Sequence, residues 1–281
     1  MNILLCTNGR YAKFAAISIY SILKNNCNEN INFYIFIDNT VTDVNDFNKI
    51  QNCYSNSKIQ LINVDKISKT LFSNLYLKTP EHISAYFRLL IFVYLQNLDR
   101  LLYIDSDIIC LKPIHNLYYT DLGENLIGAV PEYVLTKGDH PTIKRRYKKM
   151  ADYFIEKFKS DLNGYFNSGV MLFNLNKIKD KNREFIRLMK IARKNNNFFH
   201  DQNVFNIVYK NKVHFLDWNA NVLNDLRSLA CLRFEFDIIK NYQKLTTDPI
   251  FLHFTPTRPW DNSNVENANL WNSMKQELDK L

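Results

Sequence analysis

The sequence has 281 residues, 46% of them hydrophobic and 23% charged, and carries a formal net charge of +8. This composition indicates a globular chain with a sizeable core, and the positive charge suits phosphate-rich substrates, an anionic membrane surface or nucleic acid. The longest apolar run is far shorter than the roughly 18 residues of a membrane span, and five scattered cysteines without a CxxC pair argue against a structural zinc site and fit a reducing cytoplasm.

The first hundred residues alternate strand patterns with helix patterns. Short apolar runs rich in β-branched or aromatic residues predict strands, and apolar residues at helical spacing predict helices. Strands are predicted at 3–6, 32–37, 58–64 and 101–104, and helices at 12–24, 41–54 and 84–95. The opening run lacks the basic region of a secretory signal and is expected to be the first strand. The alternation predicts a mostly parallel sheet with helices on both faces, whose ligands bind beyond the carboxyl ends of the strands.

Two carboxylates, Asp105 and Asp107, interrupt the buried strand pattern of Leu101–Cys110. A charge in such a run is costly unless a partner or a metal neutralises it. Side chains two residues apart in an extended chain point the same way, so both carboxylates can converge on one Mg²⁺ or Mn²⁺ while Ser106 turns away. The alternative is a strand that ends at Asp105, with Asp107 capping a turn. Their position at a predicted strand end favours the metal site.

The remainder of the chain is more mixed. The patterns predict a strand within 165–175, a helix that begins within 200–206, a strand at 249–254 and a closing helix at 270–281. We expect the small residues Asn167–Gly169 to form a turn before the first of these strands, and His200 or Asp201 to lie near the N-cap of the helix. No glycine-rich phosphate loop is present, so a bound nucleotide would need a cation and basic side chains to neutralise its phosphates.

The densest basic cluster is Lys144–Lys149, KRRYKK. One interpretation is a surface helix that needs no partner. Another is a contact with an anionic membrane or an acidic acceptor. Nucleic acid is not expected as a partner, because no nucleic-acid-binding motif accompanies the charge.

Seven landmarks occur in order along about Met1 to Trp260. They are the opening strand and loop ending in Tyr11, Tyr86-x-Arg88-Leu89, Tyr103-x-Asp105-x-Asp107, Asp121–Gly123 through Gly128-Ala129, Phe166–Val170, Asp201-Gln202-x-x-x-Asn206, and His253 followed by Arg258-Pro259-Trp260. With these landmarks the chain resembles the family 8 glycosyltransferases, and within them the bacterial lipopolysaccharide α-galactosyl- and α-glucosyltransferases.

The resemblance implies the GT-A fold, a Rossmann-like α/β sheet that carries a metal-binding DxD at a strand end. It implies one domain over 1–281: a nucleotide-binding half at about 1–110, a sugar and acceptor half with the closing motif at about 111–260, and a C-terminal helix at 261–281. The implied activity is retaining transfer of galactose or glucose from a UDP-hexose to an oligosaccharide or glycolipid, such as a lipopolysaccharide core. The implied cofactor is Mn²⁺, with Mg²⁺ as the alternative.

Site residues follow from the same resemblance. The implied metal ligands are Asp105, Asp107 and His253. The implied catalytic residues are Asp201, Gln202 and Arg88. The implied substrate-binding residues are Thr7, Asn8, Tyr11, Arg88, Ser106, Glu132, Asn167, Ser168, Gly169, Asp201, Gln202 and Arg258. An imidazole among the ligands biases the metal towards manganese.

The chemistry of single side chains agrees with these roles. Arg88 can direct a charged fork to a phosphate or to the DxD carboxylates. Asn8 offers a donor and an acceptor to a uracil edge, and Tyr11 can stack on the base. We expect Asp201 to bind sugar hydroxyls, Gln202 to lie near the anomeric carbon, and Glu132 to contact the acceptor or else to be an exposed loop carboxylate.

Three departures from the family pattern affect this assignment. Relatives more often have Asp where this chain has Asn8. The family pattern DQD reads Asp201-Gln202-Asn203, which disfavours a carboxylate nucleophile and favours front-face substitution. The closing motif is one residue shorter, with Pro256 in place of Gly. Proline has no N–H to donate, so Arg258 is expected to make the phosphate contact.

The leading hypothesis is therefore a cytoplasmic transferase that is either free or peripheral at the inner face of the plasma membrane through Lys144–Lys149. One alternative is a glycogenin-like primer that glucosylates its own tyrosine. Another is a metal-dependent nucleotide-sugar-binding protein without catalysis.

Overall fold

The computed structural model describes residues 1–195, 199–229, 231–262 and 264–281. The strands are β1 (Asn2–Cys6), β2 (Ile31–Ile37), β3 (Ser57–Asn63), β4 (Arg100–Ile104), β5 (Ile108–Cys110), β6 (Ile127–Pro131), β7 (Phe166–Asn174), β8 (Val213–Phe215), β9 (Val222–Leu223) and β10 (Phe251–His253). The helices are α1 (Ala12–Asn25), α2 (Asn45–Cys53), α3 (Asp65–Phe72), α4 (Ile83–Tyr86), α5 (Ile91–Tyr94), α6 (His115–Tyr118), α7 (Pro141–Phe158), α8 (Lys181–Ala192), α9 (His200–Val208), α10 (Phe236–Leu245) and α11 (Ala268–Asp279). Short 3₁₀ segments are η1 (Pro80–His82), η2 (Phe87–Leu90), η3 (Leu135–Lys137), η4 (Leu175–Lys177), η5 (Trp218–Ala220) and η6 (Leu226–Ser228).

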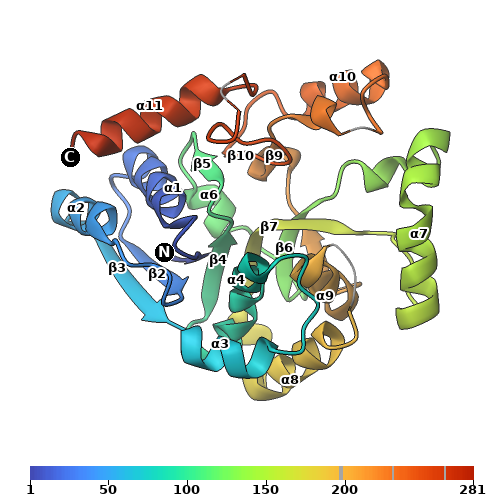
Figure 1. Ribbon diagram of the computed structural model, residues 1–281, viewed down its shortest axis with the longest axis horizontal. Coiled ribbons are helices and arrows are strands. Elements are labelled where there is room, and N and C mark those ends of the chain that lie inside the picture. Colours follow the sequence, from blue (N-terminus) through green and yellow to red (C-terminus); the bar gives the residue numbers. More distant parts are fainter. Residues whose placement is uncertain (196–198, 230, 263) are drawn as a thin grey trace.

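A seven-stranded sheet in the order β3-β2-β1-β4-β7-β6-β8 forms the centre, and a small sheet β5-β10-β9 lies beside it (Figure 1). Within the described residues, β7 alone runs against its neighbours in the large sheet, since it pairs antiparallel with both β4 and β6. The first residues of β7 therefore lie at the edge where β1, β4 and β6 end. This edge collects the side chains of the candidate site.

Both faces of the large sheet are covered. Along β1, Ile3 and Leu5 enter one apolar cluster while Leu4 and Cys6 enter the other, as the two-residue period of a strand requires. The first cluster takes side chains from α1 and α11, and the second from α4, α5, α8 and α9. Figure 1 shows α1 and α11 on one side of the sheet and α4, α8 and α9 on the other. The predicted mostly parallel sheet with helices on both faces is confirmed.

Local predictions differ from the structure in several places. The helix predicted at 41–54 begins at Asn45, and the closing helix predicted at 270–281 is Ala268–Asp279. Residues 83–94 form α4, η2 and α5 in succession rather than one helix. Residues 86–92 are all buried, so the apolar pattern there does not distinguish α from 3₁₀ turns.

Asn167–Gly169 belong to β7 rather than to a turn before it. The pairing of β7 with β6 shifts register between Ala129 and Val130. The small residues therefore mark an irregular strand with close packing.

The basic cluster Lys144–Lys149 lies on α7, between the buried residues Ile143 and Met150. Its lysines and arginines are exposed. None of the helices in the described part of the chain is long and apolar enough to span a membrane.

Candidate active site

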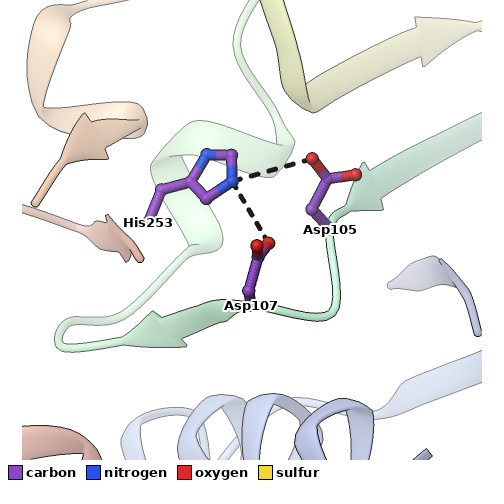
Figure 2. Close-up of side chains that lie close together, drawn as sticks. All are labelled: Asp105, Asp107 and His253. Carbon is purple, nitrogen blue, oxygen red and sulfur yellow. Dashed lines mark ion pairs between the residues drawn. The ribbon is translucent and has the colours of Figure 1, made fainter. Parts of the chain in front are cut away.

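Asp105, Asp107 and His253 meet at the edge where β4 ends (Figure 2). Asp105 follows β4 directly and Asp107 precedes β5, while antiparallel pairing of β10 with β5 sets His253 opposite Ile108. One ligand atom from each residue lies within 4.8 Å of the others. His253 Nε2 is 3.2 Å from Asp107 Oδ1 and 3.7 Å from Asp105 Oδ2. Strand β4 does end at Ile104, as the non-metal interpretation required, and the two carboxylates nevertheless converge.

The chemistry of this group fits a divalent cation. Two carboxylates and an imidazole nitrogen are ligands that Mn²⁺ accepts. Burial would lower the pKa of His253, but the neighbouring Asp107 carboxylate raises it overall. Burial would raise the pKa of Asp107, but His253 and Arg258 lower it. The site therefore favours positive charge between the carboxylates, which a proton on His253 or a bound cation supplies.

Gly169 provides the space for His253. A β-carbon at position 169 would clash with the imidazole ring, at 2.7 Å from Nδ1. The carbonyl of Gly169 accepts a hydrogen bond from the backbone N–H of Asp105 at 2.8 Å. Gly169 is therefore required by packing between two of the candidate ligands.

Arg88 is 4% exposed and lies beside Asp105 and Asp201. Its Nε donates to the Asp201 carboxylate, and its Nη1 and Nη2 donate to the carbonyl and hydroxyl of Ser168 at 2.5 and 3.1 Å. Nη1 is also 3.6 Å from Asp105 Oδ1. The guanidinium lies over the Tyr103 ring, 4.4 Å from its centroid. Arg88 was predicted to contact either a phosphate or the DxD carboxylates, and the structure shows the second of these contacts, with Asp105.

The residues that begin α9 face different ways. Asp201 is 2% exposed, and burial raises its pKa to about 6 although Arg88 opposes the shift. Gln202 Oε1 accepts from the backbone N–H and hydroxyl of Ser168 at 3.0 and 3.1 Å. Asn203 has no exposed surface, and its amide bonds the Tyr165 hydroxyl at 2.7 Å and Asn195 at 3.3 Å. The position of the second carboxylate in the family pattern is thus occupied by an amide of the core.

Two cavities adjoin the Asp105–Asp107 turn. One, of about 400 Å³, is lined by Asn8, Tyr11, Arg88 and Ser106 among others. The second, of about 300 Å³, is lined by Glu132, Asn167, Gln202 and His253 among others. Asp105, Asp107 and Arg258 line both. A larger hollow of about 670 Å³ beside α2 is lined by none of the predicted residues, and its size alone gives no reason to place the site there.

Four predicted substrate-binding residues line neither cavity beside the turn: Thr7, Ser168, Gly169 and Asp201. All four are buried, and their assignment as substrate-binding residues stays a prediction. Glu132 is not an exposed loop carboxylate, since its Oε2 accepts from Asn167 Nδ2 at 2.9 Å and burial raises its pKa.

Several contacts were not predicted from the sequence. Arg10 and Lys78 line the first cavity. Asn221, in the loop before β9, bonds both His253 and Asn167. Arg10 directly precedes Tyr11, so its place in the loop that ends at Tyr11 could have indicated a role at the site. No spacing or pattern in the sequence singles out Lys78 or Asn221.

Comparison with known proteins adds independent information. The sequence profile described as "Glycosyl transferase family 8" matches residues 2–264. Lipopolysaccharide 1,2-glucosyltransferase of Escherichia coli K12 is 30% identical over 268 residues, which are 92% of this chain and 72% of that protein. Lipopolysaccharide 1,3-galactosyltransferase of Salmonella typhimurium is 29% identical over 185 residues, 63% of this chain and 49% of that protein.

Solved structures give the same fold. The galactosyltransferase LgtC, solved with donor and acceptor sugar analogues, superposes with a TM-score of 0.73 at 20% identity, over 99% of this chain and 96% of LgtC. The bifunctional glycosyltransferase WbbM superposes with a TM-score of 0.78 at 18% identity, and the chain spans 51% of its length. The GT-A-like fold is confirmed, and the chain belongs to glycosyl transferase family 8.

Proposed function

We propose that the protein is a retaining, Mn²⁺-dependent hexosyltransferase that moves glucose or galactose from a UDP-sugar to a cell-surface oligosaccharide such as a lipopolysaccharide core. One observation carries the proposal: Asp105, Asp107 and Arg258 form the wall common to two cavities. A transferase must bring a donor and an acceptor to one reacting centre. The names of the relatives, which are glucosyl- and galactosyltransferases acting on lipopolysaccharide, support the choice of hexose and acceptor.

The donor is assigned to the first cavity. The amide of Asn8 and the ring of Tyr11 would recognise uracil there. The guanidinium of Arg258 lies 5.6 Å from the Tyr11 ring centroid and its Nε is 3.4 Å from Asp107 Oδ2. These contacts support the proposal that Arg258 would bind a diphosphate beside a metal. When bound between Asp105, Asp107 and His253, the cation would stabilise the negative charge that develops on the departing diphosphate.

The acceptor is assigned to the second cavity. Glu132 would orient an acceptor hydroxyl there, with Asn167 holding its carboxylate. Gln202 would lie against the reacting face, where Ser168 fixes its side-chain oxygen. Arg88 would keep Asp201 and Asp105 in place. With Asn203 in the core, front-face substitution is the favoured route.

The decisive test is transfer from UDP-glucose and UDP-galactose with Mn²⁺, for wild type and Asp107→Asn. Asp107→Asn is expected to lose Mn²⁺-dependent transfer and hydrolysis because the cation loses a ligand. Asp152→Asn is the matched control, since Asp152 is exposed on α7 and pairs only with Lys148 among the contacts described. Full activity of Asp107→Asn in EDTA would refute the metal assignment, and UDP-sugar binding without any turnover would indicate a non-catalytic binder.

Contact of α7 with an anionic membrane also remains a proposal, as does a cytoplasmic location. The membrane contact is supported by the exposed basic residues within Lys144–Lys149 on that helix. Sedimentation with phosphatidylglycerol vesicles is expected to weaken when Lys144, Arg145, Lys148 and Lys149 become Gln. Equal sedimentation of both forms would refute the contact.

A further inference from the structure

We propose that Asn221 is a positioning residue that fixes the tautomer of His253 and so turns a lone pair of Nε2 towards the two carboxylates. This role rests on the metal site proposed above. Asn221 is 2% exposed and His253 is 4% exposed, so the protein rather than solvent decides what each side chain bonds. Their contact is a hydrogen bond of 3.1 Å between Asn221 Oδ1 and His253 Nδ1.

The direction of this bond follows from a backbone amide two contacts away. The N–H of Gly169 can only donate, and it lies 2.9 Å from Asn167 Oδ1. The oxygen of the Asn167 amide is thereby identified. Its nitrogen then faces Glu132 Oε2 at 2.9 Å, where an ionised carboxylate can only accept. Both ends of Asn167 agree on one orientation.

The orientation of Asn167 fixes that of Asn221. Asn167 Oδ1 also accepts from a side-chain atom of Asn221 at 2.8 Å, and that atom must be Nδ2 because two carbonyl oxygens cannot bond. The oxygen of Asn221 therefore faces His253. An amide oxygen has no proton to give, so Nδ1 of His253 must carry one.

A neutral imidazole with a proton on Nδ1 has its lone pair on Nε2. Nε2 is the atom that lies 3.2 Å from Asp107 and 3.7 Å from Asp105. The other neutral tautomer would present an N–H to the same place and could not bind a cation through Nε2. A hydrogen bond to the distal nitrogen is the general way in which proteins orient metal-binding histidines. Asn221 supplies it here, at the end of a chain of contacts that begins at Glu132.

The test compares wild type, Asn221→Leu and Asn221→Asp. Asn224→Leu is the matched control: Asn224 is 7% exposed and lies directly after β9, as Asn221 lies directly before it, but its side chain bonds Glu266 and Asn267 instead of His253. Long-range ¹⁵N–¹H correlation of histidine in metal-free protein, at a pH where His253 is neutral, reports the tautomer. Calorimetry with Mn²⁺ alone reports metal affinity, and melting curves confirm folding.

Wild type and Asn224→Leu are expected to show the Nδ1–H tautomer of His253. Asn221→Leu is expected to shift it towards Nε2–H and to weaken Mn²⁺ binding about 10- to 100-fold. Asn221→Asp keeps an oxygen opposite Nδ1 and is expected to lose less affinity than Asn221→Leu.

An Nε2–H tautomer in wild type would overturn the inference, and so would unchanged Mn²⁺ affinity in Asn221→Leu or equal losses in the Leu and Asp variants. If wild type binds no Mn²⁺, the proposed metal function fails instead. The tautomer of metal-free wild type still decides the role of Asn221 in that case, and also where Asn221→Leu does not fold.

Discussion

Replacing Gly169 by Ala tests whether the space beside His253 builds the site. The added methyl would clash with the imidazole ring, and 2.7 Å to Nδ1 is shorter than real contacts of a β-carbon. Neither side can yield easily, because the carbonyl of Gly169 holds Asp105 and the ring is held by Asn221. Overpacking of this kind costs about 1–3 kcal/mol of stability. The ring must move as well, so Mn²⁺ affinity is expected to fall together with stability.

Gly128→Ala is the matched control. Position 128 is also in the central sheet and also crowded, but a β-carbon there would meet the ends of the Leu122 and Leu216 side chains, at 2.9 and 3.1 Å. Leucine ends can shift, so a smaller loss of stability and no change in Mn²⁺ affinity are expected. Urea unfolding and Mn²⁺ calorimetry on both variants separate the effects. Wild-type stability with wild-type metal binding in Gly169→Ala would refute the packing argument.

Four further predictions follow from the same contacts. Arg88→Met should destabilise the fold by about 3–5 kcal/mol in urea unfolding, because it leaves the buried carboxylate of Asp201 unpaired. Adding Asp201→Asn should restore part of that loss. If the losses of stability of the two single variants simply add in the double variant, the pairing is contradicted. Arg258→Ala should weaken UDP binding by about 1.5–3 kcal/mol in calorimetry through loss of a charged hydrogen bond, and unchanged affinity would remove Arg258 from the donor site. Asn203→Ala should cost about 1–3 kcal/mol of stability by leaving the buried hydroxyl of Tyr165 without its acceptor, yet should reduce turnover less than Asp201→Asn does. Mn²⁺ affinity, measured by calorimetry, should fall as the pH is lowered through the raised pKa of His253, because the cation and the proton compete for Nε2. The free energy of unfolding of the metal-free protein should change with pH in the opposite direction. The stability that protonated His253 contributes is complete below its unfolded pKa of about 6.5 and is lost as the pH rises through the folded value.

The sequence was informative where one local rule controls the outcome. Strand and helix periodicity predicted the α/β sheet. Asp105 and Asp107 do converge, but they lie in a turn after β4 and not in the extended strand from which their convergence was predicted. The sequence was less informative about strand direction. Nothing in the pattern of 166–174 says that β7 runs against its neighbours, so its small residues were interpreted as a turn. That reversal is what brings Ser168 and Gly169 to the end of β4.

Contacts between distant segments needed more than pattern. His253 was joined to the DxD only through the family resemblance, because residue spacing carries no information about the pairing of β10 with β5. Asn221 had no such support, since one more asparagine in a loop gives no signal. Its importance comes from the direction of its hydrogen bonds. The backbone N–H of Gly169 sets the orientation of the Asn167 amide, and Asn167 in turn sets the orientation of the Asn221 amide. The oxygen of Asn221 then determines which nitrogen of His253 carries the proton. A residue can therefore decide the chemistry of a metal ligand without touching a metal, and only the geometry of the folded chain identifies it.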